Sequence, residues 1–108
     1  MAVSPKSKSL APGAASLTDM FTCPDGVGVV AHLLVVNRSA TPTSFRASVA
    51  VDGAADATDQ YVAYDKAIQG NTIERVEGIC LSADDVLRVY ATLATLSFRL
   101  FYLEFEEE

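Results

Sequence analysis

The sequence predicts an all-β domain, a single antiparallel β-sandwich that is jelly-roll-like or Ig-like, with an extended N-terminal arm. Val, Ile, Thr, Phe and Tyr dominate the apolar positions of the 108-residue chain, which suits pleated strands better than helices. Short apolar or alternating segments recur at the spacing expected of a sandwich, and turn-forming residues separate them. Half of the residues are apolar, which is enough for one folded core.

The N-terminal segment, residues 1–15, is predicted to be the extended arm. It consists mainly of Ser, Pro, Ala, Gly and Lys, and Pro5 and Pro12 oppose a helix. Leu10 is one of its few large apolar side chains, so the segment buries too little surface to order by itself. We expect the arm to lie over a neighbouring subunit, and a flexible terminus is the alternative.

The sandwich domain is predicted to span residues 16–105. Its longest apolar run, residues 27–36, is apolar on both faces and predicts a central strand, covered on both sides or lying in a subunit interface. Residues 44–51 alternate cleanly, which predicts a strand with one face in water. The remaining strands are expected at residues 17–22, 60–68, 72–81, 86–92 and 95–105, with a bulge at Gly78.

An acidic tail, residues 106–108, is predicted to follow the last strand. It is either a solubilising end or a contact for basic residues of a neighbour, and Lys6 and Lys8 of the arm are the candidate partners. Such exposed ion pairs would set the register of two subunits rather than supply affinity. The formal net charge of −6, with the Arg residues scattered along the chain, argues against nucleic acid as a partner.

The sequence shows no signal peptide and no apolar run long enough for a membrane-spanning helix. We therefore expect a soluble protein that is made in a cytosol and has no membrane partner.

No arrangement of residues typical of catalysis is present. The one histidine, His32, lies inside the apolar run, where a core or interface role is the expected one. No nucleophile motif surrounds any serine or cysteine. Asp52, Asp56 and Asp59 share a loop, but their spacing does not match a calcium-binding loop. We predict no enzyme, no metal site and no cofactor.

Two further pairs of residues leave alternatives open. Cys23 and Cys80 are either small buried apolar residues or partners in a disulfide, within the chain or to a neighbouring copy. Tyr61 and Tyr64 are candidate subunit contacts, or else core residues. Exposed aromatic rings beside polar side chains also suit a sugar, so the same two tyrosines are the candidate platform of a carbohydrate-binding site.

Six short motifs occur in a fixed order along the chain. They are LT-x-M/L-F/Y-T-x-P at residues 17–24, V-x-N-R-S at 35–39, T-x-F-R-x-x-V-A at 43–50, Y-x-x-Y-D at 61–65, G-I-x-L-x-x-x-D-V-L-R-V-Y-A at 78–91 and A-T-L-S-F-x-L-F at 94–101. In this order the chain resembles small β-sandwich structural proteins of tailed bacteriophages. The resemblance covers residues 17–103, and its motifs are structural rather than chemical.

The resemblance implies a virion component, made in the host cytoplasm, that decorates or cements the particle at its capsid, collar or tail. Its implied partners are other virion proteins and copies of itself. A carbohydrate-binding module for host adsorption, on a tail or fibre, is the alternative function.

Overall fold

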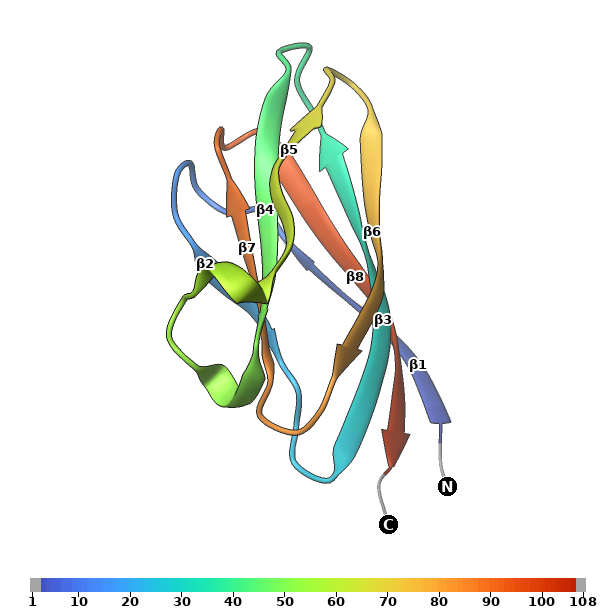
Figure 1. Cartoon of the computed structure of the whole chain (residues 1–108). Coiled ribbons are helices and arrows are strands. Elements are labelled where there is room, and N and C mark those ends of the chain that lie inside the picture. The colour runs from blue at the N-terminus through green and yellow to red at the C-terminus, as the bar shows by residue number, and fades with distance from the viewer. Residues whose placement is uncertain (1–2, 107–108) are drawn as a thin grey trace.

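The computed structural model of the chain describes residues 3–106. In this part, eight strands form two four-stranded antiparallel sheets packed as a sandwich (Figure 1), which confirms the predicted fold class. The strands are β1 (Val3–Leu10), β2 (Thr18–Thr22), β3 (Val27–Asn37), β4 (Thr43–Ala50), β5 (Tyr61–Ile68), β6 (Ile73–Leu81), β7 (Val86–Ala91) and β8 (Leu96–Glu106).

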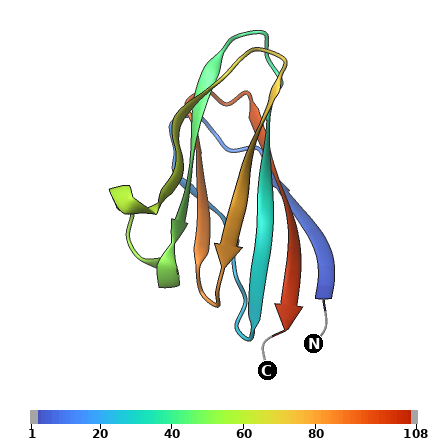
Figure 2. The ribbon, with the colours of Figure 1, turned by 45° about the vertical axis from the view of Figure 1, so that its right-hand side comes forward.

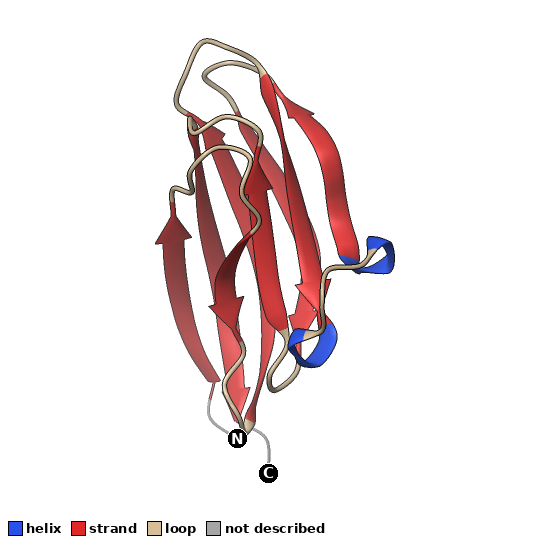
Figure 3. Ribbon diagram, turned by 90° about the vertical axis from the view of Figure 1, so that its left-hand side faces the viewer, coloured by secondary structure: helices blue, strands red, loops and turns tan. Residues whose placement is uncertain are grey.

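The connection between β4 and β5 contains two short 3-10 helices, η1 (Val51–Gly53) and η2 (Thr58–Gln60). Figure 3 shows them projecting from one side of the sandwich. Among the described residues, no helix is long and apolar enough to cross a membrane.

The strand order identifies the sandwich as a jelly roll. Sheet A has the order β1-β8-β3-β6, and sheet B has the order β2-β7-β4-β5. The first strand therefore pairs with the last, the second with the seventh, the third with the sixth and the fourth with the fifth. The chain is one long hairpin, closed at the β4–β5 connection and rolled until β8 also pairs with β3, and β7 with β4. This order excludes the Ig-like alternative.

The core lies between the two sheets and follows from alternation along each strand. In β3, the side chains of Val29, Ala31, Leu33 and Val35 are buried, whereas the residues between them point outward. β8 contributes Leu96, Phe98 and Leu100 to the same core in the same way. The largest buried rings, Phe45 of sheet B and Phe98 of sheet A, meet edge to face with their centroids 6.1 Å apart.

The seven strands expected from the sequence are all present, and each end lies within one residue of its predicted position. The apolar run is a central strand, since β3 pairs with β8 on one side and with β6 on the other. The bulge predicted at Gly78 is also confirmed. There the register of β3 against β6 shifts between Ala31 and Leu33, and Gly78 has a φ of +77°, which is costly for other residues.

The predicted arm is wrong for residues 3–10, because these residues form β1 at the edge of sheet A. β1 pairs with β8 of the same chain from Val3 opposite Phe105 to Leu10 opposite Phe98, and it begins where β8 ends (Figure 2). Without β1, the backbone groups of β8 on that side would have no partner strand. Pro5 is tolerated because an edge strand needs only half of its backbone groups for pairing.

The predicted start of the acidic tail is also shifted. Glu106 is the last residue of β8, where it pairs with Val27 of β3. Four residues of the predicted arm and tail lie outside the described residues, namely Met1, Ala2, Glu107 and Glu108.

Candidate interaction surface

The outward side of sheet A is apolar over most of its area. Val30 is 48 % exposed, Ile73 48 % and Leu103 41 %, although each is a large apolar side chain on a regular strand. We call this surface the outer face of sheet A. Its apolar residues are Val3, Pro5, Val30, Leu34, Val36, Ile73, Phe101, Leu103 and Phe105, and His32, Cys80, Ser7, Ser9 and Ser97 lie among them.

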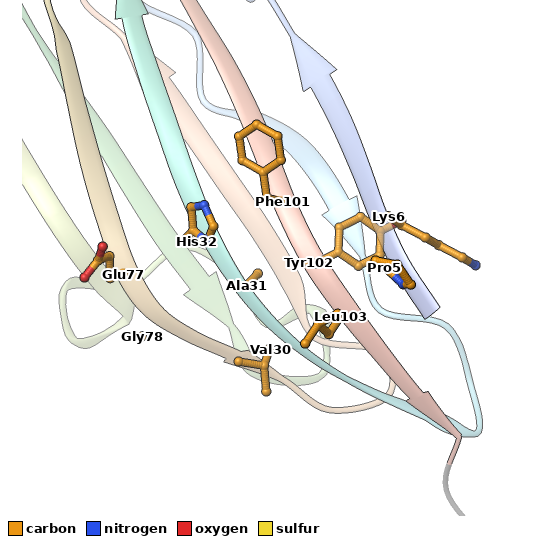
Figure 4. Close-up of a pocket in the computed structure, with 10 residues that line it drawn as sticks. All are labelled: Pro5, Lys6, Val30, Ala31, His32, Glu77, Gly78, Phe101, Tyr102 and Leu103. Carbon is orange, nitrogen blue, oxygen red and sulfur yellow. The ribbon is translucent and has the colours of Figure 1, made fainter. Parts of the chain in front are cut away.

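The centre of this face is built by β3 and β8. Val30 lies opposite Leu103, and His32 lies opposite Phe101. The rings of His32 and Phe101 stack with their centroids 5.3 Å apart and an angle of 30° between their planes. These side chains line a shallow, open hollow of about 460 Å³. Pro5 and Glu77 border it from the two edge strands (Figure 4).

Three charged side chains, Arg75, Glu77 and Arg99, stand at the margin of the apolar residues. Within residues 3–106 none of them forms an ion pair. Arg99 donates a hydrogen bond to the hydroxyl oxygen of Ser7 at 3.1 Å, and its guanidinium lies 5.8 Å from the centroid of the Phe101 ring. These groups can therefore pair with charges outside the chain at no loss of an internal ion pair.

The outward side of sheet B has the opposite character. Arg88 of β7 pairs with Asp19 of β2 at 2.9 Å, and Arg46 of β4 pairs with Asp65 of β5 at 2.7 Å. The guanidinium of Arg46 also lies over the ring of Tyr64, 4.3 Å from its centroid. Because Asp65 accepts its hydrogen bonds, the pKa of Arg46 is raised above its ordinary value. This face satisfies its charges within the chain.

The two candidate tyrosines lie at the β5 edge of this polar face. The rings of Tyr61 and Tyr64 meet edge to face, with centroids 5.0 Å apart and planes at 87°. The pKa of Tyr61 is raised, mainly by partial burial and to a lesser degree by a hydrogen bond with Asp56. Arg46 occupies one side of the Tyr64 ring. The two rings therefore do not form a flat platform, and Tyr64 has one side left for stacking.

The predicted contacts of the arm lie within one chain. The ammonium of Lys6 is 3.1 Å from a carboxylate oxygen of Glu104 on the adjacent strand β8. Leu10 packs against the chain's own core. Lys8 is exposed in β1 opposite Leu100. We expected basic residues of the arm to pair with acidic residues near the C-terminus of a neighbouring subunit. Lys6 instead forms its ion pair with Glu104 of the same subunit.

The two cysteines occupy different environments, and no disulfide joins them to each other in this structure. Cys23 is fully buried between β2 and β3, where its thiol approaches the carbonyl oxygen of Val27 at 3.5 Å. Cys80 is exposed beside Val30 on the outer face of sheet A, so it is not the small buried residue that the sequence also allowed. A disulfide from Cys80 to a neighbouring copy stays a prediction.

Acidic side chains gather in the turns at one end of the sandwich. Asp85 is buried and accepts hydrogen bonds from the backbone amides of Asp52 at 3.0 Å and Ser82 at 2.9 Å, which holds two turns together. The pKa of Asp84, an exposed carboxyl, is raised chiefly by the charge of Asp25 and then by local desolvation. No group of three or more side chains in residues 3–106 is placed to bind a metal ion.

Comparisons with known proteins identify the fold. No family model and no curated protein matches the sequence. Among solved structures, a capsid chain of Helicobacter pylori bacteriophage KHP30 matches with a TM-score of 0.61 and 15 % identity, over 100 % of this chain and 90 % of that chain. A capsid chain of Ralstonia phage GP4 matches with a TM-score of 0.56 and 16 % identity, over 99 % and 86 % of the two chains.

A third match comes from Bacillus endospore appendages, which form disulfide-linked pili. It has a TM-score of 0.61 and 7 % identity, and it covers 98 % of this chain and 89 % of that chain. The chain thus shares its fold with subunits of capsids and pili. At these identities the likeness concerns the fold and not the function.

Proposed function

We propose that the chain is a non-enzymatic structural subunit of a tailed-phage virion, which decorates or cements the particle through contacts between subunits. The observation that carries this proposal is the outer face of sheet A, since monomeric proteins rarely expose an apolar surface that is continuous over several strands. The polar outer side of sheet B, with its internal ion pairs, suits solvent. One side of the sandwich is thus built for contact and the other for water.

Two further observations support a structural role. The solved structures that share the fold are parts of self-assembling particles and filaments, which favours a subunit over an enzyme. The motifs at residues 17–103 resemble structural proteins of tailed phages. In such an assembly, many weak contacts repeated over a lattice add up to firm attachment.

The carbohydrate-binding alternative has less support from the geometry. A sugar-binding platform needs an open aromatic surface, whereas Arg46 covers one side of Tyr64 and Tyr61 stands edge-on to it. The two tyrosines fit a cluster with Arg46 at the β5 edge of an ion-paired face.

The proposal is tested on phage particles from cells that carry the gene. The particles are purified by density-gradient centrifugation, and their proteins are quantified by mass spectrometry. We expect the chain at many copies per particle, and immunogold labelling then assigns it to capsid, collar or tail. A chain that stays in the soluble lysate and is absent from purified particles would contradict the proposal.

A further inference from the structure

We infer that a second copy of this chain docks on the outer face of sheet A, with the strands of the two sheets antiparallel about a twofold axis. This inference rests on the self-association contained in the proposed function and names the surface and the arrangement. It follows from the edges of the sheets, the area of the face and the position of its charges.

Edge-to-edge pairing is the usual route by which sheets associate, and each edge strand of this sandwich opposes it. β1 contains Pro5, which has no amide hydrogen to donate. Each of the other three edge strands has a shift in register against its neighbour. The shift lies after Asp19 in the β2–β7 pair, near Ala47 in the β4–β5 pair and before Leu33 in the β3–β6 pair. Such irregularities twist an edge away from a straight partner strand. Contact between copies is therefore expected through a face rather than an edge.

The outer face of sheet A is large enough for a stable contact. It extends over four strands and, along β3, from Gly28 to Val36. At ~4.8 Å between strands and ~3.3 Å per residue, it covers roughly 500 to 600 Å². Two copies packed face to face would bury about 1,000 to 1,200 Å² in total, which reaches the lower end of specific protein interfaces.

The charges on this face select the orientation. Arg75 and Arg99 lie at the level of Leu34, and Glu77 lies about one level away, beside His32. If the strands of the two sheets ran in the same direction, all four arginines of the dimer would lie at one level, and neither Glu77 would face an arginine of the partner subunit. Repulsion among these four positive charges would oppose association.

In the antiparallel arrangement, the twofold axis passes between the levels of His32 and Leu34. Each strand then faces its own copy in the partner, so Arg75 faces Glu77 of the partner subunit and Arg99 faces the partner's Phe101. Val30 packs against the partner's Val36 in the apolar centre. The arrangement supplies two symmetric ion pairs at the rim and a cation–π contact to each Phe101 ring. The exposed position of Arg75 and Glu77 means that these pairs determine register more than affinity.

The experiment measures the oligomeric state of the purified full-length chain by sedimentation equilibrium. Val30→Asp places a carboxylate in the centre of the face. Val51→Asp is the control, because Val51 is also exposed and lies in η1, which packs beside β7 of sheet B. We expect a dimer for the unaltered chain and for Val51→Asp. Val30→Asp should raise the dissociation constant by about 100-fold or more.

The register is tested by reversing charges. Arg75→Glu and Glu77→Arg should each weaken the dimer by roughly tenfold, and the double variant should restore it, because the reversed charges again face each other. Circular dichroism checks that every variant is folded, and Leu103→Glu replaces Val30→Asp if that variant is not.

Three results would overturn the inference: a monomeric chain at about millimolar concentration, equal weakening by Val51→Asp and Val30→Asp, or a double charge reversal that does not restore the dimer. A virion subunit that uses this face to bind a different protein would be monomeric in sedimentation equilibrium and still be present in purified particles. Failure of this inference is therefore distinguishable from failure of the proposed function.

Discussion

Lys6 and Glu104, from the two ends of the sequence, form an ion pair within one chain, with 3.1 Å between the ammonium nitrogen and a carboxylate oxygen. The pair joins β1 to β8, so the N-terminal segment completes the sheet of its own subunit. β1 buries little side-chain surface, and its main contribution is to satisfy the backbone of β8.

Deleting residues 1–10 should therefore expose β8 as a new edge. β8 is 11 residues long, and its register shows no shift against β3, so it would be a flat and apolar template for other chains. We expect the truncated chain to form larger species by light scattering, even when Val30→Asp is also present. Lys6→Ala in the full chain is the control, with a change of about 0 to 1 kcal/mol in unfolding free energy. A monomeric truncated chain of unchanged stability would show that β1 does not protect this edge.

Phe98→Ala should destabilise the fold by about 3 to 5 kcal/mol, measured by urea unfolding. Phe98 is fully buried and meets Phe45 of the opposite sheet edge to face, so its removal leaves a cavity at the contact between the sheets. Val62→Ala, at an exposed position, should change the stability by less than about 0.5 kcal/mol. Equal effects of the two substitutions would mean that the sheets do not pack through Phe98.

Gly70→Ala should destabilise the fold by roughly 1 to 3 kcal/mol. A methyl group on Gly70 would collide with the backbone of Ala40, because the β5–β6 turn lies directly against the β3–β4 connection. At Gly13, by contrast, a methyl group meets nothing within 4 Å, so Gly13→Ala should change stability by less than about 1 kcal/mol. Thermal unfolding of the two variants separates the steric effect at Gly70 from the purely conformational effect at Gly13. If Gly70→Ala leaves the stability unchanged, the two loops do not approach each other closely.

Asp84→Asn should raise the melting temperature at neutral pH. The charge of Asp25 is the main cause that raises the pKa of Asp84 above its ordinary value of 3.8, so ionisation of Asp84 destabilises the folded chain. That penalty is complete at a pH above the folded-state pKa, shrinks as the pH falls through it and vanishes below 3.8. The gain from Asp84→Asn should follow the same course in thermal melts recorded across this range.

Asp25→Asn should shift the melting temperature in the same direction, because it removes the charge that contributes most to the raised pKa of Asp84. Asp59→Asn, at an exposed acid of η2, serves as the control with little change. A gain that stays constant from neutral pH to below 3.8 would assign the effect to backbone conformation, since Asp84 has a φ of +69°.

Much of the fold could be predicted from the sequence because it depends on local patterns. Alternating apolar residues, as in residues 44–51, place a strand and choose its buried face with no knowledge of its neighbours. The bulge at Gly78 follows from the tolerance of glycine for positive φ. The sequence could not place β1, since Ser, Pro and Lys carry no strand signal, and β1 exists because β8 offers it backbone partners.

The candidate surface was predictable only in part. The sequence by itself determined that residues 27–36 are apolar on both faces. Such a strand is either covered on both faces by its own chain, or covered on one face by its own chain and on the other by a partner subunit. Only the tertiary structure decided between these, because the strand order covers one side of β3 with sheet B and leaves Val30, His32 and Leu34 facing outward beside Phe101 and Leu103. The physical reason is that side-chain alternation is a local property of a strand, whereas what covers each face depends on how distant strands pair and pack.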